Sequence, residues 1–164
     1  MRSLPAAGAA APATFAALAA LACVALSACG AGGDRTPSKA SLPLVRGADV
    51  SLNVRDCNRG SNVYCARQLV VADPRYRSST ALLMAERRLL RARKWKRIDA
   101  GTGTEYGLDS PGDKLRVDLA TAWADLSAVD FGWITRKHAV SLALARALIA
   151  HSSTLSVQLQ YGGG

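Results

Sequence analysis

The segment Val63-Tyr64-Cys65-Ala66-Arg67-Gln68-Leu69-Val70-Val71 predicts a core strand, and the other elements can be placed outward from it. Its β-branched and aromatic residues favour extended backbone, and Asp73-Pro74 follows as a turn signal. Residues 115–119 alternate apolar and polar side chains, which predicts a half-buried strand, and residues 155–161 alternate in a similar way. Weaker strand signals lie at residues 44–54 and 95–98.

Three segments between these strands have helical periodicity. Residues 79–95 begin at Ser78-Ser79, which are good N-caps, and their apolar side chains share one broad face. A short helix is predicted from residue 119 to residue 130. Residues 136–151, with Thr135 as a candidate N-cap, are apolar almost all the way round. We therefore expect this last helix to be buried on more than one side or covered by a partner.

The predicted elements follow one another as strand, helix, strand, strand, short helix, helix, strand. This order predicts an α+β fold in which the helices pack on one face of a small, mostly antiparallel sheet. The order is also compatible with a ferredoxin-like arrangement. We expect a single domain from residue 44 to residue 161, followed by a disordered glycine tail at residues 162–164.

Residues 1–33 have the pattern of an export signal, because a single basic residue, Arg2, precedes a long uncharged run. The run contains Leu26-Ser27-Ala28-Cys29, which resembles the lipobox of bacterial lipoproteins. The resemblance implies that residues 1–28 are a signal peptide that is removed. It also implies that the thiol of Cys29 carries a diacylglycerol, with acyl chains such as palmitate.

The lipobox would place the mature protein at the cell membrane, on its extracytoplasmic side, held there by the lipid. Two acyl chains anchor a protein almost permanently, since each buried methylene contributes about 0.8 kcal/mol. Residues 29–43 contain no large apolar cluster, so we expect a flexible tether between anchor and domain. One alternative is that the apolar run spans the membrane uncleaved. Cys23 is a second possible acceptor, but Ala20 and not a leucine lies three residues before it, so we assign Cys23 to the removed signal peptide.

Two further cysteines, Cys57 and Cys65, lie in the exported part of the chain. An exported protein meets an oxidising compartment, and the residues between the two cysteines begin as a turn, so we predict a disulfide. In the chain-entropy model, closing so short a loop stabilises the fold by roughly 2–3 kcal/mol. A metal site is not expected, because the two histidines, His138 and His151, lie far along the chain.

Basic residues are concentrated in residues 75–97, where nine Lys and Arg accompany one acid, Glu86. Removal of Arg2 with the signal peptide lowers the formal net charge of the chain from +9 to +8. Spacings of three and four place several cations on the outer face of the helix predicted at residues 79–95. These cations, here called the basic ridge, are Arg87, Arg88, Arg91 and Lys94, and Arg93, Lys96 and Arg97 would extend them.

The basic ridge indicates an acidic partner, such as anionic lipid headgroups or wall polymers, and export argues against nucleic acid. A solvated face that only aids solubility is the alternative. The sequence contains no catalytic motif, and no cofactor is expected. We therefore predict a lipid-anchored module of the cell envelope that binds a surface or a protein partner. A carrier of an apolar ligand and a secreted hydrolase without a recognisable motif remain as alternatives.

Overall fold

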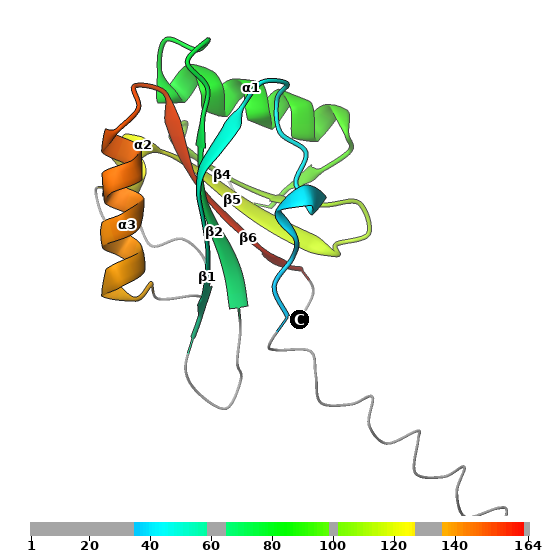
Figure 1. The fold of residues 1–164 in the computed structure, drawn as a ribbon. Helices are drawn as coiled ribbons and strands as arrows, with labels where there is room; N and C mark the ends of the chain where they lie inside the picture. The colour runs from blue at the N-terminus through cyan, green and yellow to red at the C-terminus, as the bar shows by residue number, and fades with distance from the viewer. Residues whose placement is uncertain (1–34, 59–64, 99–101, 127–135, 163–164) are drawn as a thin grey trace, which may run out of the picture. The chain divides into compact units, whose positions relative to one another are not determined.

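Six strands form one antiparallel sheet with the order β1-β2-β6-β5-β4-β3 (Figure 1). The computed structural model of the chain describes residues 35–58, 65–98, 102–126 and 136–162. The strands are β1 (Asp49–Cys57), β2 (Cys65–Ala72), β3 (Lys96–Arg97), β4 (Glu105–Asp109), β5 (Leu115–Thr121) and β6 (Thr154–Tyr161). The helices are the 3-10 helix η1 (Lys39–Ser41) and the α-helices α1 (Ser79–Ala92), α2 (Ala122–Leu126) and α3 (His138–Ile149). The α+β class and the antiparallel sheet are therefore confirmed.

The predicted core strand is β2, which lies between β1 and β6. All of its residues are buried except Arg67, which is half-buried. Strands β5 and β6 also coincide with predicted strands, whereas β4 was not predicted. Its signal is a short alternation of two apolar residues, Tyr106 and Leu108, and the glycine between them weakens that pattern.

Helices cover both faces of the sheet. Neighbouring residues of a strand point to opposite faces, and those of β2 contact a different helix on each side. Leu69 and Val71 belong to the main core together with leucines of α1. Val70, between them, packs in a second core cluster with leucines of α3. The expectation that the helices share one face is corrected here: β2 is apolar on both sides, so each face needs its own helix. The leucines are Leu82, Leu83 and Leu90 in α1, and Leu144 and Leu148 in α3.

The strand pairing differs from a ferredoxin-like arrangement, so that expectation is also corrected. A split β-α-β unit joins two parallel strands through a helix, with another strand between them. Here the segment that contains α2 and α3 joins β5 to β6, which are antiparallel neighbours. The element order alone could not separate these topologies, because it leaves the partner of each strand open.

The N-terminal segment, residues 35–48, is packed onto the domain. Leu42 is buried in the main core, and the Nε group of Arg67 donates a hydrogen bond of 2.7 Å to the carbonyl oxygen of Pro37. The expectation of a flexible tether up to residue 43 is therefore corrected: residues 35–43 are packed on the domain. The domain includes residues 35–43, because one leucine among small and polar neighbours is enough to fix the segment.

Cys57 and Cys65 form the predicted disulfide, with an S–S distance of 2.07 Å. The two residues are directly opposite each other at the ends of β1 and β2. The bond therefore closes the β1–β2 hairpin at its connecting end.

Helix α3 begins beside a buried acid of β1. The Oδ2 atom of Asp56 accepts a 3.0 Å hydrogen bond from the backbone N–H of Lys137, and its Oδ1 atom lies 3.3 Å from the Lys137 ammonium. Asp56 is fully buried, and a carboxylate at a helix N-terminus also interacts favourably with the helix dipole. The predicted N-cap, Thr135, lies outside the described residues.

Candidate functional site

Three of the four basic-ridge residues lie on α1, and the fourth lies beyond its end. The helix ends at Ala92, with Arg93 as its C-cap. Lys94 follows with a φ of 64°, in the left-handed region, so helical spacing no longer aligns it with Arg87 and Arg91. The placement of Lys94 in the ridge is therefore corrected, because the helix stops one turn earlier than its sequence pattern suggested.

The remaining three arginines line a hollow of about 440 Å³ together with a methionine. Positions 84, 87, 88 and 91 are separated by three or four residues, so they occupy one helix face over two turns. Arg88 and Arg91 are exposed, whereas Met84 and Arg87 are half-buried. This hollow, called the arginine groove below, is lined by Met84, Arg87, Arg88 and Arg91.

A tyrosine of β4 fixes the guanidinium group of Arg87. The Nη1 group of Arg87 donates a hydrogen bond of 3.2 Å to the Tyr106 hydroxyl, and the Arg87 guanidinium carbon lies 4.4 Å from the ring centroid. The guanidinium carbon of Arg97, in β3, lies 5.3 Å from the same ring. Tyr106 thus contacts two cations through its aromatic ring.

Acidic side chains that form ion pairs are found elsewhere in the described part of the chain. Within it, no ion pair involves Arg87, Arg88 or Arg91. The recorded pairs join Asp56 to Lys137, Asp73 to Arg75, Asp109 to Arg116 and Asp125 to Arg136. The arginine groove therefore keeps its positive charge available for an external anion.

The one acid of α1, Glu86, points into the protein and away from the arginine groove. It is 1% exposed, and its two carboxylate oxygens accept the backbone N–H of Val45. Burial raises the pKa of Glu86 to about 7, the Val45 hydrogen bond lowers it, and the nearby charge of Asp73 raises it further. Glu86 therefore holds the N-terminal segment and does not neutralise the arginines.

Asp73 fastens the same segment from another side. Its carboxylate accepts hydrogen bonds from the Arg75 side chain, which lower the pKa of Asp73 below its ordinary value. The Nη2 group of Arg75 also donates to the carbonyl oxygen of Arg46. Gly47 has a φ of +89° and lies so close to the Arg75 guanidinium that a side chain there would collide with it. The turn at residues 46–47 is thus shaped to fit this guanidinium.

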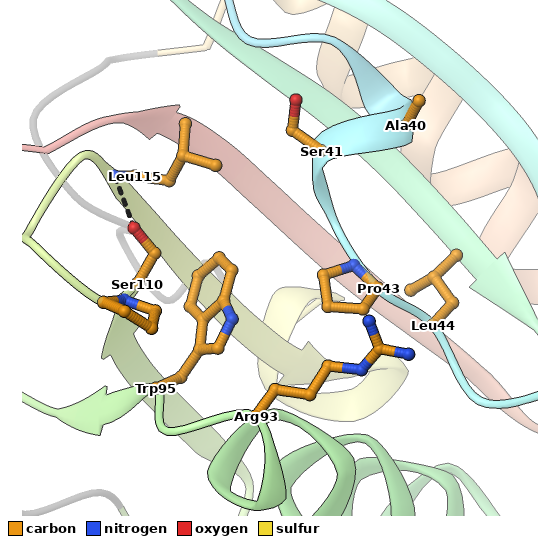
Figure 2. Close-up of a pocket in the computed structure, with 9 residues that line it drawn as sticks. Ala40, Ser41, Pro43, Leu44, Arg93, Trp95, Ser110 and Leu115 are labelled. Carbon is orange, nitrogen blue, oxygen red and sulfur yellow. Dashed lines mark hydrogen bonds between the residues drawn. The ribbon is translucent and has the colours of Figure 1, made fainter.

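A second hollow, with a volume of about 440 Å³, is formed by the N-terminal segment, the end of α1 and the turn between β4 and β5. Figure 2 shows the residues that line it. The Trp95 ring forms one wall, and Arg93 extends toward Pro43 and Leu44 (Figure 2). The Oγ atom of Ser110 accepts a 2.9 Å hydrogen bond from the backbone N–H of Leu115, which fixes the turn. The remaining lining residues are Ala40, Ser41 and Pro111. Trp95 is only 7% exposed, so it offers a ligand little surface.

A row of glutamines is buried on the sheet face that α3 covers. The Nε2 group of Gln68 donates to Gln158 Oε1 at 2.8 Å, and Gln158 Nε2 donates to Gln160 Oε1 at 3.2 Å. Among the described residues, Gln68 Oε1 and Gln160 Nε2 have no hydrogen-bond partner. This row is internal to the fold, and we assign it a structural role.

The core under α3 is filled by side chains, because Val70, Leu144 and Leu148 pack together there. The outer side of α3 leaves Leu142 44% exposed and Ile149 74% exposed. The helix is therefore buried on one side, and a partner that covers its outer side stays a prediction.

The acids and histidines of the described residues form no group of three or more that could hold a metal ion. Two acids of the described residues, Asp109 and Asp125, form ion pairs with Arg116 and Arg136. The sequence reasoning found the arginines but missed Met84 and Tyr106. Met84 could have been found from its spacing to the arginines, whereas Tyr106 comes from a strand that was not predicted.

The predicted lipidation site, Cys29, and the signal peptide lie outside the described residues. No helix within the described ranges is long and apolar enough to cross a membrane. No protein-family model, curated protein or solved structure matches the chain. The function is therefore argued from the site itself.

Proposed function

We propose that this chain is a lipid-anchored lipoprotein of the cell envelope whose domain binds anionic groups through Arg87, Arg88 and Arg91. The observation that carries the proposal is the arginine groove: three arginines on one helix face line one hollow, and no acid of the described residues pairs with them. Clustered unpaired cations on a surface attract anions and bring them in faster.

Because the N-terminal segment is packed on the domain, only a short link would connect the domain to a lipid on Cys29. If Cys29 carries the lipid, only five residues (30–34) lie between the anchor and the first described residue, Arg35. A fully extended chain of that length spans about 20 Å. The domain would then stay close to the membrane surface, whereas a tether to residue 43 would have let it move much further.

The size of the electrostatic effect suggests what the arginines do. A cation close to an anionic membrane contributes about 1 kcal/mol, so three contribute about 3 kcal/mol. Two acyl chains already hold the protein on the membrane. The arginines would therefore act mainly on how the domain is oriented and on what it recruits.

The alternatives have less support in the described residues. A carrier would need space between α3 and the sheet, where Val70, Leu144 and Leu148 are packed. A hydrolase would need two carboxylates facing a cleft, whereas Asp109 and Asp125 are each held by an arginine.

The test uses residues 33–164, which form one compact unit, and vesicles of anionic or neutral phospholipid. We expect binding to anionic vesicles at low salt, and weakening at 0.15 M salt, where the screening length is about 8 Å. Replacing Arg87, Arg88 and Arg91 by Glu should abolish the binding. The matched control replaces Lys39, Arg46 and Lys114 by Glu, which changes the net charge equally on other exposed surfaces. Equal loss in both variants would contradict the proposal, as would a wild-type domain that binds no anionic surface.

A further inference from the structure

We infer that the arginine groove selects phosphate esters over carboxylates, and that its ligand is the phosphodiester headgroup of an anionic membrane phospholipid. This inference rests on the proposed function and narrows it from anions in general to one chemical class. It follows from the kind of cation in the groove, from the fixed position of Arg87, and from the apolar side chain that lines the same hollow.

The cations in the groove are all arginines, as are 16 of the 21 basic residues of the chain. A guanidinium group is planar and presents its N–H groups as a rigid fork, which matches two oxygens of a phosphate. A lysine ammonium provides a point charge without that geometry. Three forks on one helix face can share the non-bridging oxygens of one phosphate and the bridging oxygens beside them.

The position of Arg87 is fixed before any ligand binds. Its hydrogen bond to the Tyr106 hydroxyl and its contact with the ring hold the guanidinium group against β4. The same group lies 3.9 Å from the sulfur of Met84 through Nη1. A side chain that is already ordered loses less conformational freedom on binding, which increases affinity and geometric selectivity.

Arg97 adds a second cation beside the same ring, at 5.3 Å from its centroid. The same tyrosine thus contacts one cation from α1 and one from β3.

Met84 and the size of the groove favour a headgroup over inorganic phosphate. A hollow of about 440 Å³ along this helix face exceeds what one phosphate fills. The thioether of Met84 gives the glycerol carbons next to the phosphate an apolar contact. The short link from Cys29 to Arg35 favours a membrane phospholipid as the source, because it keeps the domain near the headgroups.

The test uses the full chain in a neutral detergent and two water-soluble probes of equal charge, glycerophosphoglycerol and glycerate. Binding is followed by the NMR signals of the arginine Nε–H groups. We expect glycerophosphoglycerol to bind about tenfold more tightly than glycerate, the difference made by about 1.4 kcal/mol. Arg87→Lys and Arg91→Lys keep the charge. Each should weaken the binding of glycerophosphoglycerol several-fold and leave the binding of glycerate unchanged. The control Arg46→Lys should change the affinity for neither probe. Tyr106→Phe should weaken only the binding of glycerophosphoglycerol.

The outcomes separate this inference from the proposed function. Equal binding of both probes would overturn the selection of phosphate and leave an anion-binding module in place. Binding of neither probe, at low salt and with the fold intact by circular dichroism, would overturn both. A third arm compares dihexanoylphosphatidylglycerol with poly(glycerol phosphate) at equal phosphate concentration. Tighter binding of the polymer, after correction for its many sites, would assign the groove to a wall polymer and overturn the phospholipid as ligand.

Discussion

Both carboxylate oxygens of Glu86 lie 3.1 Å from the backbone nitrogen of Val45 and accept its single N–H group. This contact joins the middle of α1 to the N-terminal segment across 41 positions of sequence. The carboxylate is buried, and no ion pair within the described residues offsets its charge. The domain therefore carries a titratable group that binds the N-terminal segment but whose negative charge is unfavourable to bury.

The pH dependence of stability follows from that charge. Burial raises the pKa of Glu86 from 4.5 to about 7 in the folded chain. Its contribution to stability is therefore complete below about pH 4.5 and is lost as the pH rises through 7. Glu86→Gln, which still accepts the Val45 N–H, should stabilise the protein at pH 8 by up to about 3 kcal/mol and have little effect at pH 4.5. Urea unfolding of both proteins at the two pH values measures this difference.

The charged groups around Glu86 could add their own pH dependence to the measured stability. Asp73 faces it with a negative charge. The hydrogen bond from Arg75 lowers the pKa of Asp73 and raises that of Arg75, so neither group titrates between pH 5 and pH 8. Glu86→Gln and the wild type share all other titrating groups, so their difference isolates Glu86. A difference that stays constant between pH 5 and pH 8 would show that Glu86 does not titrate there.

The N-terminal segment should contribute measurably to stability. Leu42 is 5% exposed and belongs to the main core, so Leu42→Ala should cost about 2–4 kcal/mol. A chain that begins at residue 44 also loses the hydrogen bond from Arg67 to Pro37 and should be destabilised by at least as much. Unfolding in urea checks both, with the exposed Ser41→Ala as the control. A chain from residue 44 as stable as the chain from residue 33 would show that the segment is only loosely attached.

The disulfide should stabilise the hairpin by constraining the unfolded chain. Replacing Cys57 and Cys65 by Ser should lower the free energy of unfolding by roughly 2–3 kcal/mol in the chain-entropy model. Mass spectrometry of the non-reduced protein should find the two cysteines in one linked peptide pair. Two thiols that alkylate without prior reduction would show that the bond does not form.

Strand positions were predictable where both the pattern and the burial were simple. The residue types around Leu69 and Val71 predict a strand, and the alternation of apolar and polar residues does so at residues 115–119 and 155–161. Pairing partners were not predictable, because hydrophobic alternation says which face is buried and not which strand lies beside it. The start of α3 shows the same limit: its nearest polar partner, Asp56, is 81 positions away in sequence.

The candidate site was predictable only as far as helix geometry reaches. Spacings of three and four placed Arg87, Arg88 and Arg91 on one face, and α1 confirms that these positions are helical. Lys94 was misplaced, because Arg93 and Lys94 leave the helix without the glycine that usually marks such an end. The role of Tyr106 depends on the packing of β4 against α1, a long-range contact without a local signal.

The lipid anchor is the prediction on which the location of the protein depends. The thiol of Cys29 is the group that would form the thioether, so Cys29→Ala should leave an uncleaved precursor in cells. It should also abolish labelling by a clickable fatty acid, detected on a gel together with the size of the protein. Cys23→Ala is the matched control, and it should be labelled and cleaved like the wild type. If Cys23→Ala loses the label and Cys29→Ala keeps it, the acylated residue is Cys23. If the wild-type protein keeps residues 1–28 and takes up no label, the apolar run is instead an uncleaved membrane span.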